Sequence, residues 1–595
     1  MSSIAARVST SIRTLPNRVF AIDLRSLALF RVTMAILLLI DLCRHLPLLD
    51  AFYSDSGLLP RGQERLVESV WRISLHAANG QALFALALLL IALLTALALL
   101  AGWRTRRAAI ISFVLYASLL NRAPVITGGG EQLLALLLFW ACFLPLGARW
   151  SVDAALASDD TASIPVNPHR SWASTALLLQ VGIACLWVTA LTPAANPLAA
   201  MLSQQTYTAA AGLWLQHHAV LLHWTQWLVR VIGLLAPLLL FAPLACQPLR
   251  ALAVVALALL QIGALLCFDL GVTPWVGLVA LTPFIGTEIW DRLHPRTVAE
   301  TPIRLFHDQR RPRSLRLHRL LREFLILPSA QLLAAQNQPR TATLLQANES
   351  WIVIDHDDRA YLCWGALVLL LRRSPLFGPL GWLLSKLPLA GIGDRLYHLI
   401  RRLGGGTVST AATLPAPTSR NAQRFAALCL LLAVLWNLSL TGLLPRTLQG
   451  VLAPPLRLLR LDQPWDRYLP RDTQGRGWFV APGELANGQQ VDLLRLGQPL
   501  DFAAPAVLAH RQGNSFWHRY LDALWRHQDD RDRYAHYLCR HRQWNVDTTP
   551  ARKLQSLKIV YLLERDTHHD GDSVEQHVLW QQDCGQLSDP LDSDG

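Results

Sequence analysis

Long apolar runs separated by short polar segments fill the first half of the chain. About twenty apolar residues are enough to cross the hydrocarbon core as a helix. The third, fourth and eighth runs are short, so each could be tilted, re-entrant or extended by polar residues. The pattern predicts eight spans: Leu27–Leu46, Gln81–Leu100, Ala109–Leu120, Gln132–Leu146, Ala173–Leu191, Ala219–Phe241, Leu249–Leu270 and Trp275–Ile289.

The second half alternates between polar segments and one further apolar run. Residues 300–403 are rich in arginine, and Trp351–Leu362 reads as two short strands around a polar turn, which predicts a small α/β domain. Residues 404–423 have the composition of a linker, and Phe425–Leu443 (within a segment at 424–444) is a ninth predicted span. The predicted fold class is mainly α: a polytopic transmembrane helix bundle with a small α/β cytoplasmic domain and an α+β extracytoplasmic C-terminal domain at 446–595.

Within the C-terminal domain, three local patterns predict structure. Asn487-Gly488 between two extended runs predicts a β-hairpin. Ser515–Arg540 predicts a helix, and Leu557–Glu564 predicts a strand. The end after Asp566 is acidic and rich in histidine, which is typical of a disordered segment.

Composition and charge agree with a membrane protein. Hydrophobic residues make up 52% of the chain and charged residues only 16%, below the quarter or so that is usual in soluble proteins. The net charge of +13 resides mainly in arginines beside the spans, so we expect contact with the lipid bilayer rather than with nucleic acid. The basic N-terminal segment 1–20 is expected in the cytoplasm of a bacterial-type inner (plasma) membrane. The segment Thr192–Gln216 has no Lys or Arg and is expected outside.

The nine cysteines form no CxxC pair, so neither a zinc site nor a dithiol site is expected. Cys539 and Cys584 are the only cysteines in the predicted external domain. They could form a disulfide, which requires an oxidising compartment, or remain free thiols. The N-terminus shows no cleavable signal peptide pattern, because its first apolar run is long.

Charged residues in or beside the apolar runs are the first candidates for a site. Arg31, Asp41 and Arg44 either face a site inside the bundle, or, for the last two, pair with each other on one helix face. Asn121, Arg122 and Glu131 bracket a loop with three glycines, which suits either ligand approach or a structural turn. The histidines at 217, 218 and 223 lack nearby carboxylates or cysteines, so interfacial histidines are favoured over a metal site.

Five motifs resemble the HTTM membrane domain, the family that includes the vitamin K-dependent gamma-carboxylase. They are LALFR (27–31), AFYSDSGLLP (51–60), NRAPVITGGGEQLL (121–134), ARWSVDAAL (148–156) and FDLGVTPWVGLVAL (268–281), within residues 21–293. The resemblance implies a helix bundle, a quinone cofactor and a lysine base. The family lysine position is Thr192 here, and Gln261 stands in place of a family histidine. The first lysine in the chain is Lys386, so carboxylation by that mechanism is not expected.

The motifs also supply weaker candidates. Arg31, Arg122 and Glu131 are candidate catalytic residues, while Tyr53, Asp55, Asn121 and Gln261 are candidate ligand-binding residues. No metal ligand is expected.

Residues 302–403 resemble the DCC thiol-disulfide oxidoreductase-like domain, whose signature is a strand ending in YDGxCxxC. The corresponding segment is Ile303–Ser314, in which Asp308 is retained and Arg311 and Ser314 occupy the cysteine positions. Disulfide exchange needs a thiolate, so we expect no such activity.

These observations lead to two hypotheses. The first is a non-carboxylating membrane protein or scaffold, with lipid or quinone as the expected ligand. The second is a membrane enzyme with altered carboxylase-like or quinone-linked redox chemistry. A transporter finds little support, because the spans show no internal repeat.

Overall fold

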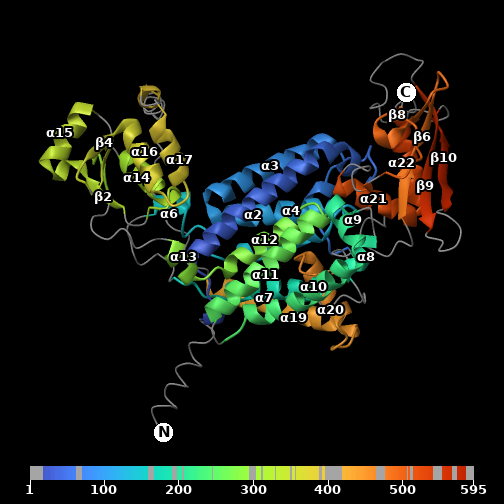
Figure 1. Cartoon of the computed structure of the whole chain (residues 1–595), viewed down its shortest axis with the longest axis horizontal. Coiled ribbons are helices and arrows are strands. Elements are labelled where there is room, and N and C mark those ends of the chain that lie inside the picture. Colours follow the sequence, from blue (N-terminus) through green and yellow to red (C-terminus); the bar gives the residue numbers. More distant parts are fainter. Residues whose placement is uncertain are drawn as a thin grey trace, which may run out of the picture.

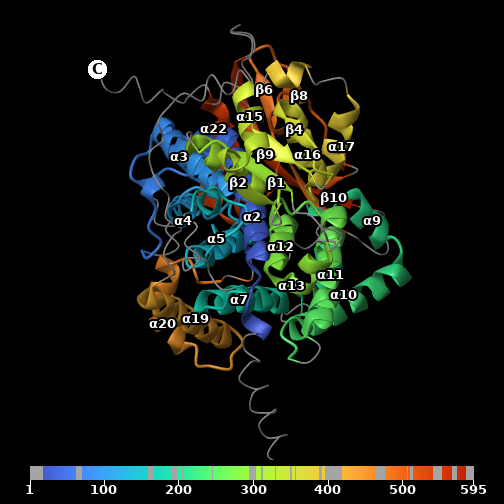
Figure 2. The same cartoon turned by 90° about the vertical axis from the view of Figure 1, so that its left-hand side faces the viewer.

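The described part of the computed structural model is mainly helical. It covers residues 18–61, 70–157, 167–189, 197–203, 207–243, 246–293, 303–309, 312–327, 330–348, 351–355, 357–387, 391–395, 419–463, 465, 476–505, 507–508, 514–540, 553–565 and 573–584. A helix bundle occupies the middle of the molecule, and two smaller domains lie at its opposite ends (Figures 1 and 2).

Each predicted apolar run overlaps a helix. The bundle comprises α2 (Leu24–His45), α3 (Ala82–Ala101), α4 (Thr105–Arg122), α5 (Gly129–Ala141), α7 (Trp172–Thr189), α10 (Ala219–Leu240), α11 (Cys246–Cys267), α12 (Thr273–Leu281) and α19 (Arg420–Leu440). Short elements connect them: η1 (Leu46–Leu48), η2 (Leu49–Tyr53), η4 (Leu75–Ala77), α6 (Val152–Leu156), α8 (Pro197–Ser203), α9 (Ala210–Gln216), η7 (Thr282–Phe284) and α13 (Thr287–Leu293).

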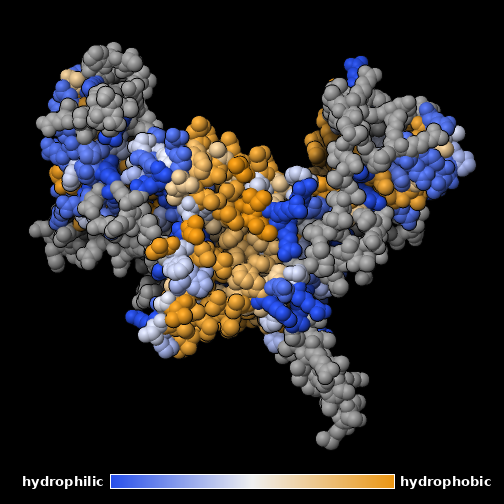
Figure 3. Space-filling view, turned by 180° about the vertical axis from the view of Figure 1, so that it is seen from behind, coloured by the Kyte–Doolittle hydropathy of each residue, from blue (hydrophilic) through white to orange (hydrophobic). Residues whose placement is uncertain are grey.

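Six of the described helices are long and apolar enough to cross a membrane: α2 with its extension to Tyr53, α3, α7, α10, α11 and α19. The predicted fourth and eighth spans correspond to the shorter apolar helices α5 and α12. All residues of α5 are buried, so this helix forms the centre of the bundle. Figure 3 shows an apolar surface across the middle of the molecule, with hydrophilic surface on either side, as expected where lipid surrounds the helices.

The domain at the α2 N-terminal end, which we call the middle domain (303–395), has a four-stranded sheet in the order β2-β1-β3-β4. The strand β1 (Arg304–His307) is parallel to β2 (Gln331–Ala334) and antiparallel to β3 (Ile352–Ile354), which pairs with β4 (Ala360–Leu362). The two strands predicted around the polar turn are thus confirmed. Its helices are α14 (Pro312–Phe324), α15 (Pro339–Asn348), α16 (Cys363–Arg373) and α17 (Gly378–Lys386).

The C-terminal domain follows α20 (Thr447–Leu458) and contains a sheet in the order β10-β9-β6-β7-β8, with β5 also paired to β9. Its elements are β5 (Arg476–Val480), β6 (Pro482–Leu485), β7 (Gln490–Asp492), η10 (Leu493–Arg495), β8 (Gln498–Pro499), α21 (Ser515–Arg526), α22 (Gln528–Arg540), β9 (Leu554–Arg565) and β10 (Ser573–Asp583). The hairpin at Asn487-Gly488 is confirmed between β6 and β7, with Gly488 at φ +80°.

Two expectations for this domain are wrong. The single helix predicted over 515–540 is two helices, because His527 adopts an extended backbone between them. The segment after Asp566 is predicted to be disordered, yet in its described part, residues 573–584, β10 pairs with β9 over nearly its whole length. Acidic composition predicted disorder there, but the backbone hydrogen bonds of a long hairpin and the bond from Cys584 to Cys539 hold the strand in place.

Candidate functional site

A buried carboxylate at the C-terminal end of α2 is the centre of the first group of polar contacts. Asp41 has no exposed side-chain surface and accepts a hydrogen bond from the Tyr116 hydroxyl at 2.7 Å. Arg44 Nη1 lies 3.3 Å from Asp41 Oδ1, and His45 Nε2 lies 3.5 Å from Asp41 Oδ2. Asp41, Arg44 and His45 share one face of α2, because residues three and four apart are neighbours on a helix. The His45 Nδ1 is in turn hydrogen-bonded to the Tyr53 hydroxyl at 2.9 Å.

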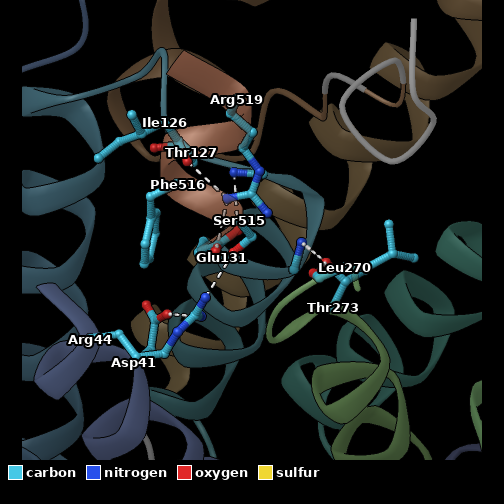
Figure 4. Close-up of polar contacts among 12 residues, drawn as sticks. Asp41, Arg44, Ile126, Thr127, Glu131, Leu270, Thr273, Ser515, Phe516 and Arg519 are labelled. Carbon is cyan, nitrogen blue, oxygen red and sulfur yellow. Dashed lines mark hydrogen bonds and ion pairs between the residues drawn. The ribbon is translucent and has the colours of Figure 1, made fainter. Parts of the chain in front are cut away.

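The second group joins the glycine loop to the C-terminal domain (Figure 4). Glu131 caps its own helix, accepting the Gly128 N–H at 3.0 Å. Its other oxygen lies 3.1 Å from Arg519 Nη1 on α21, which also donates to the Ile126 carbonyl at 2.8 Å. A Cβ at Gly128 would overlap the Arg519 guanidinium. The glycine loop of the sequence motif therefore admits an arginine of the same chain.

Arg44 connects these two groups. Its Nη2 donates to the Ser515 hydroxyl at 2.8 Å, while Nη1 stays with Asp41. Its guanidinium also lies 4.6 Å from the ring centroid of Phe516, a cation–π distance. Asp41 and Arg44 thus pair as one sequence hypothesis proposed, and Arg44, whose side chain is 25% exposed, also contacts α21.

A third group lies beside the second, where the chain leaves α20. Arg460 is buried and donates to the side-chain oxygens of Asn121 and of Gln132, the latter at 2.9 Å. Asp462 pairs with Arg72 at 2.7 Å, and its carbonyl accepts from Gln132 Nε2 at 3.3 Å. Asn121 and Gln132 both belong to the motif 121–134, so a second arginine of the C-terminal half engages the same motif.

Burial at α21 also shifts two ionisable groups of the C-terminal domain. Burial lowers the pKa of His518 to about 4, opposed by Asp269 and assisted by Arg519. Burial alone lowers the pKa of Arg519, but Glu131, together with Tyr207 and Asp41, outweighs it, so the pKa lies above its ordinary value. At neutral pH the interface therefore holds a neutral imidazole beside a charged guanidinium.

The remaining candidate residues lie apart from these groups. Arg31 is fully buried and donates to the carbonyls of Leu146 (3.2 Å) and Trp150 (2.6 Å), towards the other end of α2. Gln261 packs against Gly277 on α12, where a Cβ would overlap the amide. Thr192 and Arg311 lie outside the described residues.

Arg122 and Asp55 form a smaller pair at the edge of the bundle. Their closest atoms are 3.8 Å apart, and Asp55 is closer to Arg61, at 2.7 Å. The Arg61 hydrogen bond is the largest influence on the Asp55 carboxyl and lowers its pKa. The sequence candidates are thus distributed over at least three places rather than gathered in one site.

Sequence reasoning did not single out His45, Tyr116, Gln132, Arg460 or Arg519. His45 carried a signal, since it lies four residues after Asp41 in an apolar run. Tyr116 and Gln132 are ordinary residues by type, and nothing near Arg460 or Arg519 in the sequence indicates that they enter the bundle.

An open cavity of about 620 Å³ lies at the opposite end of α2. Its lining includes Arg18, Asp23, Gln247, Arg250 and Glu288, and none of the catalytic or ligand-binding candidates of the sequence analysis. Arg250 is buried and donates to the Leu240 (3.3 Å) and Val19 (2.5 Å) carbonyls. A cavity with arginines and an amide beside apolar helices suits a polar headgroup more than a purely apolar molecule.

Among the described residues no group of three or more His, Cys, Asp or Glu is arranged to hold a metal ion. His217 and His218 are exposed, lie between α9 and α10, and bond through Nδ1 to backbone carbonyls of α9. Cys539 and Cys584 form a disulfide between α22 and the end of β10, with sulfur atoms 2.02 Å apart.

The apolar belt, the six long apolar helices and the buried bundle define the class of this protein: an integral membrane protein. Residues 20–290 match the model of the HTTM domain, so the bundle up to α13 is similar to that family. No curated protein and no solved structure matches the chain.

Proposed function

We propose that this protein is a non-carboxylating membrane scaffold whose bundle holds the C-terminal domain on one side and the middle domain on the other. One observation carries the proposal: arginines of the chain's own C-terminal half bind the polar residues of the 121–134 motif. Arg519 reaches Glu131, and Arg460 reaches Asn121 and Gln132. Groups that could otherwise face a ligand are thereby engaged in holding a domain.

The amino-acid sequence supports the loss of carboxylase chemistry. A general base must be able to lose its proton near neutral pH, which lysine can do when buried. No lysine precedes Lys386, and the family base position carries Thr192. Arginine stays protonated in proteins and cannot replace it.

We propose that the middle domain is a DCC-like domain that has a binding role and no disulfide-exchange activity. Ser314 lies in the first turns of α14, directly after β1, where that chemistry needs a thiolate. Its hydroxyl oxygen accepts the Asp308 N–H at 3.1 Å. A hydroxyl in that position can maintain the turn but cannot attack a sulfur atom.

We place the N-terminus and the middle domain in the cytoplasm and the C-terminal domain outside a bacterial-type plasma membrane. Arg104 and Arg149 lie beside helix ends at the middle-domain end of the bundle, and Arg106 and Arg107 lie in the first turn of α4, which supports this orientation by the positive-inside rule. The disulfide belongs to the domain at the other end, which suits an oxidising compartment.

A lipid or quinone headgroup is the proposed ligand, and the cavity of about 620 Å³ is its proposed place. Purification in mild detergent followed by native mass spectrometry tests this. We expect a bound lipid or quinone whose occupancy falls in an R18Q/Q247A variant but not in R292Q, an exposed arginine outside the cavity lining. Equal occupancy in the natural sequence, R18Q/Q247A and R292Q would show that the ligand does not bind in this cavity.

A second function is favoured by one specific arrangement, the series Asp41, His45 and Tyr53. A carboxylate, an imidazole and a phenol in this order can move a proton from the phenol and stabilise the resulting imidazolium. An enzyme with altered quinone-linked chemistry could use it.

One experiment separates the two functions. The reconstituted protein is given a reduced quinone with dissolved oxygen as the electron acceptor, and formation of the oxidised quinone is followed for the natural sequence, H45Q and the control H217Q. The scaffold proposal expects the same background rate in all three. Turnover that H45Q abolishes and H217Q retains would overturn it in favour of an enzyme.

A further inference from the structure

The helix α17 of the middle domain presents an apolar face to the outside of its domain. Gly381 is buried and packs against the backbone of α16, where a Cβ would overlap Leu371 and Arg372. On the other side, Leu380, Trp382 and Leu383 are 46%, 57% and 49% exposed. The helix therefore packs on its domain through Gly381, with Phe377 and Leu384 against the domain core, while Leu380, Trp382 and Leu383 are exposed.

The exposed face continues beyond the helix at both ends. Leu376 is 64% exposed and Leu387 is 45% exposed. Within α17, Leu380 and Leu383 are three residues apart and share one side of the helix, while Leu376 and Leu387 lie just outside it and extend the exposed apolar surface. We call Leu376, Leu380, Trp382, Leu383 and Leu387 the α17 face. An apolar surface of this kind on a small polar domain marks a contact with a partner or a membrane.

Position and charge indicate the bilayer as the partner. Figure 1 places α17 on the side of the middle domain that is nearer the bundle, whose apolar belt is visible in Figure 3. Arg372 and Lys386 beside the face are exposed. Basic residues beside a stripe of leucine and tryptophan are typical of helices that lie in the headgroup region of an anionic leaflet.

A second copy of the chain is a weaker candidate for the same face. With about half of each side chain exposed, five residues present less than the roughly 800 Å² per partner that a stable interface buries. A bilayer needs no such matching area, because the bundle already holds the domain at its surface.

We propose that the α17 face rests in the headgroup region of the membrane beside the bundle, so that the middle domain is a peripheral membrane domain as well as a tethered one. Trp382 would lie at the level of the headgroups, with Leu380 and Leu383 reaching the first acyl carbons. The proposal does not depend on the scaffold function, only on the bundle lying in a bilayer.

Photo-crosslinking in nanodiscs that contain anionic lipid tests the proposal in the full chain. Leu383 is replaced by p-benzoylphenylalanine, a side chain of similar apolar character. The positive control is the same change at Leu97 on α3, which is 50% exposed within the apolar belt. The negative control is Thr343 on α15, an exposed residue on another helix of the same domain. Lipid adducts are identified by mass spectrometry.

We expect lipid adducts at Leu383 to approach the yield at Leu97 and to exceed that at Thr343 by about tenfold. R372E/K386E should lower the Leu383 yield severalfold in anionic nanodiscs. Three outcomes would overturn the proposal: a Leu383 yield as low as that at Thr343 while Leu97 reacts, crosslinked dimers in place of lipid adducts, or crosslinks to another protein. An unchanged yield in R372E/K386E would overturn the role of charge.

Discussion

The two ends of the bundle hold their domains in different ways. At the C-terminal-domain end, buried charged groups meet across the contact, as Glu131 with Arg519 and Arg72 with Asp462 show. At the middle-domain end, the described polar contacts are fewer and involve backbone groups: Arg319 donates to the Ala157 carbonyl at 2.9 Å, and the Trp150 N–H donates to Glu323 at 3.2 Å.

This difference indicates which domain is part of the membrane fold. A buried charge is tolerated only when it is paired. When the C-terminal domain separates from the bundle, the charged groups on both sides of the contact lose their partners. Hydrogen bonds between a flexible side chain and a partly buried backbone group contribute only modestly and can be exchanged for bonds to water. Dissociation of the C-terminal domain from the bundle is therefore expected to require a large free energy. Dissociation of the middle domain is expected to require a small one.

The largest expected effect comes from breaking the buried pair. R519M leaves Glu131 buried and unpaired, so the free energy of opening of α21 should fall by about 4 kcal/mol. Amide hydrogen exchange of residues 515–526 in nanodiscs measures this quantity. The double variant E131Q/R519M removes the uncompensated charge and should recover most of the loss.

R495Q is the matched control, because Arg495 forms a more exposed pair with Asp501 in the same domain at 3.3 Å. Its effect should stay below about 1 kcal/mol. If R519M changed exchange no more than R495Q, the distinction between the two ends would fail.

The disulfide should have the next largest effect, confined to one end. It closes a loop of 45 residues, so C539S/C584S should destabilise the C-terminal domain by about 3 kcal/mol. Hydrogen exchange should rise in β9 and β10 and remain unchanged in β1 to β4. The variant C43S, which removes a free cysteine, serves as the control. Equal destabilisation of both domains would show that they unfold as one unit.

Acid should weaken the C-terminal-domain end specifically. Burial holds the pKa of His518 at about 4, below the ordinary 6.5, so the undocked state binds the extra proton between these values. The contribution of His518 to docking stability is thus fully present above pH 6.5 and is lost as the pH falls towards 4. The groups facing this imidazole are the Tyr207 ring, Asp269 and Arg519.

At pH 5 the loss relative to pH 7 should be about 2 kcal/mol. H518Q, which does not titrate, should remove most of this difference in the exchange of α21. A pH dependence that is identical in H518Q would assign the effect to other groups.

The helices of the bundle could be predicted from the sequence because apolar runs are a local signal. Every predicted run overlaps a helix, and the strands and hairpin follow from equally local patterns. The end after Asp566 shows the limit of composition: β10 is held by pairing with β9 and by the disulfide to Cys539, and the acidic composition of the segment indicates neither.

The site was less predictable, because its contacts join residues hundreds of positions apart. Glu131 and Asn121 were candidates from the motif, but their partners Arg519 and Arg460 have no local mark that sends them into the bundle. For Arg31 the charge in an apolar run correctly indicated burial. It could not indicate that backbone carbonyls of Leu146 and Trp150 would be the acceptors.

The smallest expected effect lies at the middle-domain end. R319A removes the partly buried hydrogen bond to the Ala157 carbonyl, so the loss of docking free energy should be about 1 kcal/mol or less. Hydrogen exchange of α6 and α14 measures it, with R340A, an exposed arginine elsewhere on the middle domain, as the control. A loss as large as that of R519M would mean that both domains are integral parts of the membrane fold. A small loss that grows severalfold when the α17 face is also made acidic by L383E would instead show that lipid, rather than the bundle, supplies the main support for the middle domain.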